Sequence, residues 1–169
     1  GGTKADGGSF TTDGGTADMP AANPDGGISL GMPLPTPKNQ WTRVDFPNSM
    51  CDDGTPTGIG VDITGSKNLV IYLEGGGACW EAFTCSNGFS THGPFGQAQW
   101  NSNNYGSLNH ASDTIFDDSD AKNPFAGWNK IFVPYCTSDV HAGDNEESLV
   151  SGGKRITMHF KGRANMKAF

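Results

Sequence analysis

The stretch "VIYLEGGGACWEAFTC", residues 70–85, leads from a hydrophobic segment into three consecutive glycines that two cysteines closely follow. Residues 68–74, "NLVIYLE", are an almost unbroken β-branched and aliphatic run, which predicts a strand buried on both faces. Gly75-Gly76-Gly77 then give a backbone without side chains, which can adopt positive φ or approach another group closely. An oxyanion hole needs such a backbone, and a flexible turn without chemistry is the alternative.

Other patterns around this stretch predict an α/β domain. Residues 41–46, "WTRVDF", and a second segment within 51–63 predict an antiparallel strand pair joined by an Asp-Gly turn. Residues 129–136, "NKIFVPYC", predict another buried strand. Residues 86–127 are rich in Asn, Ser, Gly and Asp and predict short helical turns in a surface excursion. Residues 158–169, "MHFKGRANMKAF", predict the start of a helix, and we expect the natural protein to continue beyond it.

Residues 1–38 differ in composition from the rest of the chain. They contain 9 Gly, 5 Pro and one aromatic residue, Phe10, which predicts a disordered tether before a domain spanning 39–169. Such a leader is typical of a bacterial lipoprotein spacer with its lipid-bearing cysteine upstream, and an ordinary disordered tail is the alternative. The string "GISLG" at 27–31 fits G-x-S-x-G, but it lacks a strand–turn–helix context, so we interpret Ser29 as a chance match and not a nucleophile.

Charge and cysteine content narrow the function classes. The net charge of −7 disfavours nucleic-acid binding and docking on anionic membranes. The sequence contains no run of 18 apolar residues, so no transmembrane helix is predicted. Cys51, Cys79, Cys85 and Cys136 form no CxxC pair, which disfavours a zinc ribbon. Their even number favours two disulfides in an exported protein over four reduced cysteines in the cytosol. The spacing leaves all three possible pairings open.

Four blocks in a fixed order resemble one known family. They are "CDDGTPTG" at 51–58, "LVIYLEGGGACW" at 69–80, "WNKIFVPYCTSDVHAGD" at 128–144 and "HFKGRANMKAF" at 159–169. Together they resemble the pectinacetylesterase/Notum family, particularly its bacterial members, which are secreted serine esterases of the α/β-hydrolase fold. The resemblance implies the N-terminal part of that fold, with a central, mostly parallel sheet and an N-terminal β-hairpin.

The resemblance also implies roles for individual residues. Gly76 and Gly77 would supply N–H groups to the oxyanion hole, while the nucleophile, Asp and His would follow the helix that begins near Gly162, beyond Phe169. In the animal enzyme a Trp stands where this chain has Gly77, which leaves the acyl-chain preference open. The expected disulfides are a local Cys79–Cys85 bond behind the glycines and a Cys51–Cys136 bond between the first hairpin and the strand at 131–136.

We therefore expect the N-terminal portion of an exported carboxylic-ester hydrolase that is inactive alone and needs no cofactor. The substrate class would be an acylated polysaccharide or a similar ester. The location would be secreted or cell-surface, with lipoprotein anchoring in the periplasm or at the outer membrane left open. The alternative is a non-enzymatic, tethered surface or binding protein.

Other candidate site residues have weaker support. Asp139 and His141 would either face substrate or form a wall of the cleft without chemistry. The acidic cluster in "DTIFDDSDAKN", at 113–123, lacks EF-hand spacing, so a solvated loop is favoured over a calcium site and no metal site is predicted. The histidines without a partner spacing, His92, His110 and His159, are interpreted as surface or packing residues. Core or loop anchoring is favoured over sugar stacking for Trp80, Trp100 and Trp128.

Overall fold

The structure is a computed structural model that describes residues 34, 36–86, 93–112 and 114–169. The tether expected at 1–38, including Ser29, lies almost wholly outside these residues, as do His92 and Asp113. No helix in the described ranges is both long and apolar enough to cross a membrane.

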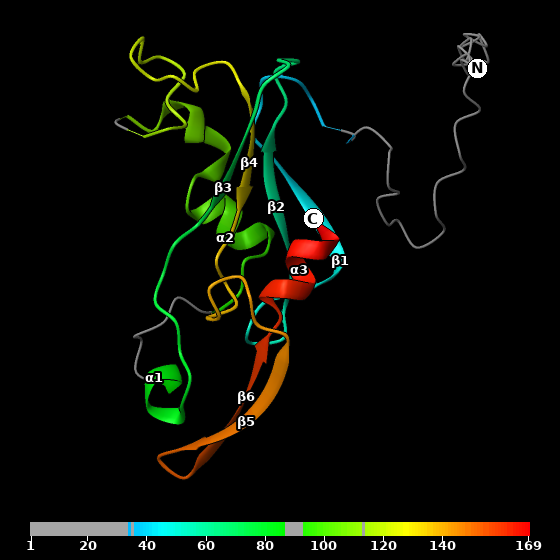
Figure 1. The fold of residues 1–169 in the computed structure, drawn as a ribbon, viewed down its shortest axis with the longest axis vertical. Helices are drawn as coiled ribbons and strands as arrows, with labels where there is room; N and C mark the ends of the chain where they lie inside the picture. Colours follow the sequence, from blue (N-terminus) through cyan, green and yellow to red (C-terminus); the bar gives the residue numbers. More distant parts are fainter. Residues whose placement is uncertain (1–33, 35, 87–92, 113) are drawn as a thin grey trace, which may run out of the picture.

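A four-stranded mixed sheet forms the centre of the molecule (Figure 1). Its strands are β1 (Thr42–Met50), β2 (Pro56–Asp62), β3 (Leu69–Leu73) and β4 (Asn129–Val133), in the order β1-β2-β4-β3. The β1–β2 and β2–β4 pairs are antiparallel, whereas β3 and β4 are parallel. The predicted N-terminal hairpin and both predicted hydrophobic strands are therefore confirmed.

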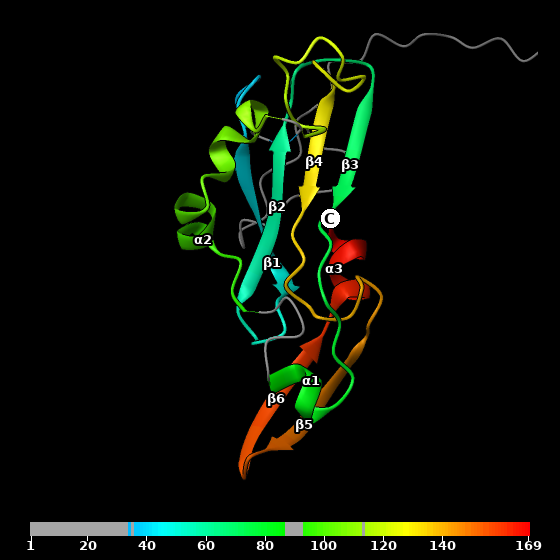
Figure 2. The same ribbon diagram turned by 90° about the vertical axis from the view of Figure 1, so that its left-hand side faces the viewer.

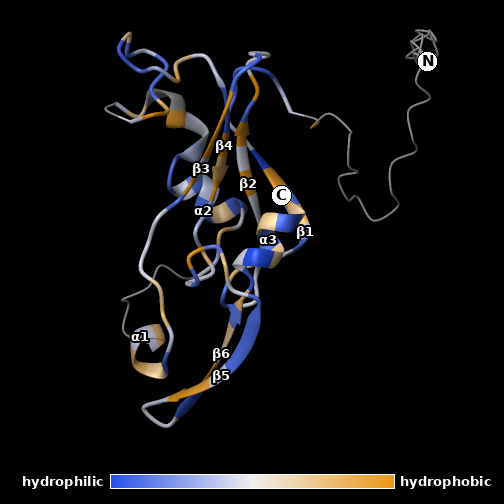
Figure 3. Ribbon diagram, in the orientation of Figure 1, coloured by the Kyte–Doolittle hydropathy of each residue, from blue (hydrophilic) through white to orange (hydrophobic). Residues whose placement is uncertain are grey.

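The prediction that β3 is buried on both faces is wrong. Leu69, Ile71 and Leu73 are 47%, 56% and 44% exposed, because β3 is the last strand in the sheet order and no described element covers their face. Tyr72, on the opposite face, packs against the aromatic core. Figure 2 shows β3 at the free edge beside β4, and its apolar colouring is visible in Figure 3.

The segment between β3 and β4 begins with the short helix α1 (Ala82–Ser86), which lies beside β5, and then covers the other face of the sheet. This second part contains the short helices α2 (Gln97–Ser102) and η1 (Tyr105–His110), as predicted for residues 86–127. Aromatic side chains hold it to the sheet. Tyr105 lies with its ring 5.5 Å from that of Trp100 and 5.0 Å from that of Phe132 on β4. Trp100 and Trp128 are anchors as predicted, but Trp80 is 72% exposed, so the anchoring prediction is wrong for it.

A β-hairpin that the sequence analysis did not predict precedes the last helix. It consists of β5 (Asn145–Ser151) and β6 (Lys154–Phe160), which turn at Gly152 and Gly153 with φ of 56° and 79°. Helix α3 (Gly162–Ala168) follows, so Met158–Phe160 belong to β6 and not to the predicted helix. The apolar face of the hairpin packs on Cys79 and Cys85, which explains why a segment beginning with "NEES" forms a strand.

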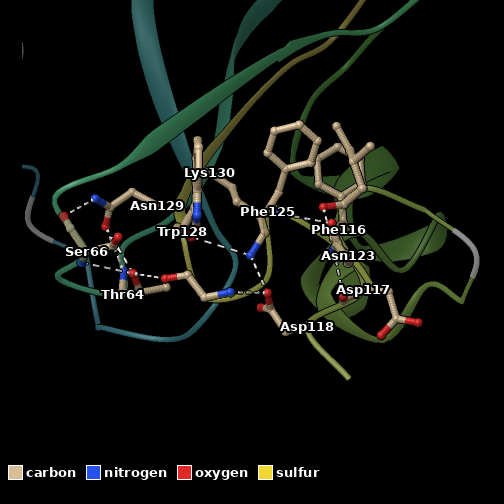
Figure 4. A network of polar contacts seen from close by, with 12 residues as sticks. Thr64, Ser66, Phe116, Asp117, Asp118, Asn123, Phe125, Trp128, Asn129 and Lys130 are labelled. Carbon is tan, nitrogen blue, oxygen red and sulfur yellow. Dashed lines mark hydrogen bonds and ion pairs between the residues drawn. The ribbon is translucent and has the colours of Figure 1, made fainter. Parts of the chain in front are cut away.

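The acidic segment near 117–120 has a structural role at the amino ends of β3 and β4 (Figure 4). The Asp118 carboxylate accepts hydrogen bonds from Lys130 Nζ at 2.6 Å and from the Gly127 N–H at 2.8 Å, and the Lys130 side chain is fully buried. Asp117 is 6% exposed and accepts from Ser119. The prediction of a solvated loop is therefore wrong for these two aspartates. Among the residues in the described ranges, no three His, Cys, Asp or Glu side chains are arranged to hold a metal ion.

Candidate active site

The candidate site lies at the carboxyl ends of the parallel strands β3 and β4, where ligands commonly bind in open α/β sheets. The Glu74 N–H donates to the Val133 carbonyl at 2.9 Å, which extends the β3–β4 ladder by one bond. The glycine run Gly75–Gly77 follows directly. The segments that follow β3 and β4 both leave the sheet at the end where α3 and the β5–β6 hairpin lie (Figure 2).

The glycine run is open to approach. Gly75 and Gly76 are exposed and Gly77 is half-buried. None of the three has positive φ, and a Cβ built on Gly75 would meet no atom within 4 Å. Of the two possibilities stated for these glycines, positive φ is therefore not the one found, and what they provide is access to the backbone.

The amides of the glycine run are uncommitted. Within the described residues, neither the Gly76 nor the Gly77 N–H donates a hydrogen bond to another protein group. A hollow of about 160 Å³ lies beside the run and is lined by Glu74, Gly75, Gly76, Tyr135, Val140 and His141, together with Leu73. Free N–H groups next to a small hollow can donate to an oxygen that enters it.

Glu74, which the sequence analysis did not single out, anchors the start of the run. Its carboxylate accepts from the Tyr135 N–H at 2.8 Å and from the Tyr105 hydroxyl at 3.3 Å. Burial raises the pKa of the Glu74 carboxyl, and the bonds from Tyr135 and Tyr105 and the nearby His141 partly oppose that rise. Burial, followed by the neighbouring Glu74 charge, raises the pKa of Tyr105 to about 12.

The loop at 137–144 faces the glycine run and has an unusual backbone. Ser138, Val140 and His141 have φ of 55°, 53° and 59°, a region that non-glycine residues rarely occupy and β-branched residues almost never do. The Val140 N–H donates to the Tyr135 hydroxyl at 2.8 Å, which holds this conformation in place. Such strain is common at functional sites, where the surrounding structure maintains it.

His141 lies at the hollow as the sequence analysis expected of a cleft residue. Its Nε2 is 2.9 Å from the Glu74 main-chain oxygen, so the tautomer that carries a proton on Nε2 donates to that carbonyl. Its ring lies 4.9 Å from the Tyr135 ring. The structure thus brings His141 together with Gly76, and contact between His141 and substrate stays a prediction.

The Asp139 carboxylate lies between the 137–144 loop and the start of α3. Its Oδ1 accepts from the Thr137 hydroxyl at 2.6 Å and from the His141 N–H at 3.1 Å, and its Oδ2 accepts from the Gly162 N–H at 2.7 Å. Both carboxylate oxygens are therefore engaged in joining the 137–144 loop to the start of α3. A Cβ on Gly143 or Gly162 would approach Asp139 within 2.5 Å and 2.4 Å, so both positions require glycine for close packing.

The two disulfides of the structure have the pairing that the family resemblance implies. Cys51 and Cys136 are joined with their Cα atoms 4.9 Å apart, and Cys79 and Cys85 with theirs 5.0 Å apart. The Cys79 N–H donates to the Ser138 carbonyl at 2.9 Å. The distal end of the glycine run is thus fixed both to α1 and to the 137–144 loop.

The sequence analysis missed Glu74, Tyr105 and Tyr135. One signal was available, namely a carboxylate at the end of an otherwise hydrophobic strand and directly before glycines. His159, interpreted as a surface or packing residue, pairs its Nδ1 with Glu146 at 2.9 Å on the β5–β6 hairpin and does not reach the hollow.

Comparisons with known proteins give the family. The profile of the pectinacetylesterase family matches residues 40–169. The chain is 34% identical over 97 residues to palmitoleoyl-protein carboxylesterase notum2 of Xenopus laevis, covering 56% of this chain and 19% of that protein. It is 31% identical over 102 residues to inactive palmitoleoyl-protein carboxylesterase notum1b of Danio rerio, covering 58% of this chain and 68% of that protein.

A solved structure supports the same assignment at the level of fold. The Wnt deacylase Notum from Drosophila matches with a TM-score of 0.50 at 20% identity, covering 76% of this chain and 36% of the Drosophila chain. The matched region also spans only 19% of human palmitoleoyl-protein carboxylesterase NOTUM. The chain has part of an α/β-hydrolase fold and belongs to the pectinacetylesterase/Notum family of carboxylesterases.

Proposed function

We propose that this chain is the N-terminal part of a serine carboxylic-ester hydrolase whose oxyanion hole includes the N–H groups of Gly76 and Gly77. The observation that carries the proposal is that, among the described residues, neither N–H group donates to another protein group at the carboxyl end of a parallel strand, and that Gly76 lines the adjoining hollow. In such a hydrolase a serine attacks the ester carbonyl, and the oxygen that becomes negative accepts hydrogen bonds from preorganised donors. The nucleophile, Asp and His would come from the rest of the protein.

The exposed face of β3 supports the proposal that further chain covers this sheet. Leu69, Ile71 and Leu73 present a contiguous apolar edge that soluble proteins usually bury. A strand that paired in parallel with the free edge of β3 would place its own carboxyl end beside Gly75–Gly77. That position is suited to a nucleophile that shares the hollow with Gly76.

Export is proposed from the disulfides. Cys51–Cys136 and Cys79–Cys85 are buried bonds of the kind that persists in oxidising compartments. The tether at 1–38, the domain boundary at 39 and an upstream lipid anchor are part of the same proposal. We propose an acetyl ester on a polysaccharide as the substrate class, by family membership.

The proposal is tested on the longer protein with p-nitrophenyl acetate. A Cβ at Gly76 or Gly77 should hinder the approach of the carbonyl oxygen to the N–H groups, so we expect each Ala variant to lose about 10²–10³-fold in kcat, the size of effect typical when one such donor no longer acts. KM and Tm should change little, because neither glycine has positive φ. Gly106→Ala in η1 is the matched control, since its Cβ would meet no atom within 4 Å and Gly106 does not line the hollow. Near-normal kcat in folded Gly76→Ala and Gly77→Ala variants would exclude the oxyanion hole.

A second candidate function is a non-catalytic, tethered binding protein. One relative favours it, namely notum1b of Danio rerio, which is named an inactive carboxylesterase. The match with this chain covers 68% of that protein. If the natural reading frame stops at Phe169, the binding protein is favoured. If it continues into a serine-bearing strand–turn–helix segment, the hydrolase is favoured.

A further inference from the structure

We infer that Glu74 is the positioning residue of the glycine run, and that its carboxylate is what releases the Gly76 N–H from the β-sheet. The inference rests on the proposed function, because it explains how the proposed oxyanion hole is formed and held. Both carboxylate oxygens of Glu74 are engaged by Tyr135 and Tyr105, so we assign Glu74 a positioning role and not a catalytic one.

The hydrogen-bond register of β3 and β4 shows what Glu74 changes. In a parallel ladder that begins with the Glu74 N–H on the Val133 carbonyl, the next bonds would join the Tyr135 N–H to the Glu74 carbonyl and the Gly76 N–H to the Tyr135 carbonyl. Neither bond is present among the described residues. The ladder therefore stops at the position from which the glycine run leaves.

The Glu74 side chain replaces the first of these bonds. Tyr135 is a buried residue, and its N–H would cost free energy if it were left without an acceptor. It donates to Glu74 Oε2 at 2.8 Å instead of to the Glu74 main-chain oxygen. The backbone after Glu74 can then diverge from β4 without leaving the buried Tyr135 N–H unsatisfied, and the Gly76 N–H donates to no acceptor within the described ranges.

His141 hydrogen-bonds the Glu74 main-chain oxygen, which Tyr135 would bond if the ladder continued. Its Nε2 lies 2.9 Å from the Glu74 carbonyl, and the His141 backbone is held at φ of 59° by its own N–H bond to Asp139. On the other side the Tyr105 hydroxyl donates to Glu74 Oε1. Hydrogen bonds of Glu74 therefore connect the start of the glycine run to β4, to η1 and to the 137–144 loop.

The carboxylate form is the form that fits these partners. The Tyr135 N–H and the Tyr105 O–H are both donors, and an ionised carboxylate offers an acceptor oxygen to each. A proton on either oxygen would replace an acceptor by a donor and would weaken the hold on Tyr135 or on Tyr105. The titratable groups that face Glu74 are Tyr105 and His141, and burial keeps the pKa of Glu74 above its ordinary value. Positioning should therefore weaken as the pH falls through a range higher than that of an exposed glutamate.

The experiment compares Glu74→Ala and Glu74→Gln with Glu81→Ala in the longer protein. Glu81 is an exposed carboxylate on the far side of the glycine run, and its recorded hydrogen bonds use only its backbone. Glu74→Ala should lower kcat on p-nitrophenyl acetate about 10²-fold with little change in KM, as expected of a displaced catalytic backbone. Glu74→Gln should retain more activity and should lose the acid limb of the kcat profile that comes from Glu74. Glu81→Ala should match the wild type.

A second measurement needs no ester turnover. In amide NMR of the protein, the signals of Gly75–Gly77 and Tyr135 should titrate together with the Glu74 carboxyl in the wild type. In Glu74→Gln these signals should lose that titration, and the Tyr135 amide should exchange faster with solvent. Glu81→Ala should change neither.

The outcomes separate the two levels of the argument. If the wild-type longer protein hydrolyses no ester but the amides follow Glu74, the proposed function fails and the positioning role stands. If the wild type is active, and folded Glu74→Ala keeps its kcat or Glu74→Gln has the wild-type pH profile, the positioning role is overturned. Should Glu74→Ala fail to fold, the Glu74→Gln profile and its amide titration decide.

Discussion

The two disulfides close loops of very different length, so their removal should cost different amounts of stability. Cys51 and Cys136 are separated by 85 positions, and Cys79 and Cys85 by 6. In the chain-entropy description the constraint on the unfolded chain grows with the logarithm of loop length, which gives about 4.6 kcal/mol for the long loop and about 2.2 kcal/mol for the short one at 25 °C. The long-loop disulfide should therefore contribute about 2.4 kcal/mol more to the free energy of unfolding.

The assay is urea unfolding of the doubly substituted proteins Cys51→Ala/Cys136→Ala and Cys79→Ala/Cys85→Ala. Paired substitution avoids a free thiol that could form non-native disulfides. Both pairs are buried, so the loss of apolar contacts is similar in the two variants, and the difference between them reports mainly the loop term. A long-loop variant that is already unfolded in water agrees with the expectation when the short-loop variant still melts cooperatively.

The reverse order would refute the reasoning. If the Cys79→Ala/Cys85→Ala protein loses as much stability as the other variant or more, the short disulfide acts through native contacts. The apolar side chains of the β5–β6 hairpin that pack on Cys79 and Cys85 would be the first place to look for them.

Two further predictions concern stability at single positions. Gly143→Ala should lower Tm and cost about 1–3 kcal/mol, because its Cβ would lie 2.5 Å from the Asp139 carboxylate, whereas Gly75→Ala should leave Tm unchanged; equal melting of both variants would contradict the packing argument. Asp62→Asn should raise Tm at pH 7, because burial raises the pKa of Asp62 and its Oδ1 has no partner within the described residues. A raised pKa means that wild-type stability is fully present below the ordinary pKa of an aspartate and is lost as the pH rises through the folded-state value. The advantage of Asn should therefore vanish in acid, and thermal melts from pH 3 to 8 check this.

Much of the sheet could be predicted because its signals are local. The hairpin of β1 and β2 follows from alternating segments around a turn, and β4 follows from a short hydrophobic run. The same kind of run predicted the β3 strand but not its exposure. Hydrophobicity indicates that a strand prefers burial, but it does not show whether a neighbouring element covers it. The β5–β6 hairpin was missed because its apolar face is narrow, although the Gly-Gly pair at its turn was a usable signal.

In the candidate site, too, the local motif could be predicted and the contacts between distant residues could not. The glycine run is a local motif, and the family resemblance gave it a meaning. The position of Glu74 before the glycines was a usable signal, but its bonds could not be predicted, because its partners Tyr105 and Tyr135 are 31 and 61 positions away and meet it only in the folded chain. Asp139 and His141 were identified by the resemblance as cleft residues, but their bonds to Gly162 and to Glu74 depend on the backbone of the 137–144 loop, which a sequence does not reveal.

The way in which the β3–β4 ladder ends bears on whether the glycine run has a chemical role. A turn that only reverses the chain usually satisfies its N–H groups internally, as the Asp139–Ala142 turn does through a hydrogen bond of 3.1 Å. Here Pro134 offers no N–H, Tyr135 donates its N–H to a side chain, and the Gly76 N–H has no acceptor in the part of the chain that the structure describes. An exposed N–H is inexpensive to leave free, because water can occupy it in the resting protein. In the proposed hydrolase the same group would exchange that water for the developing oxyanion without any movement of the backbone, which is the property that electrostatic preorganisation requires.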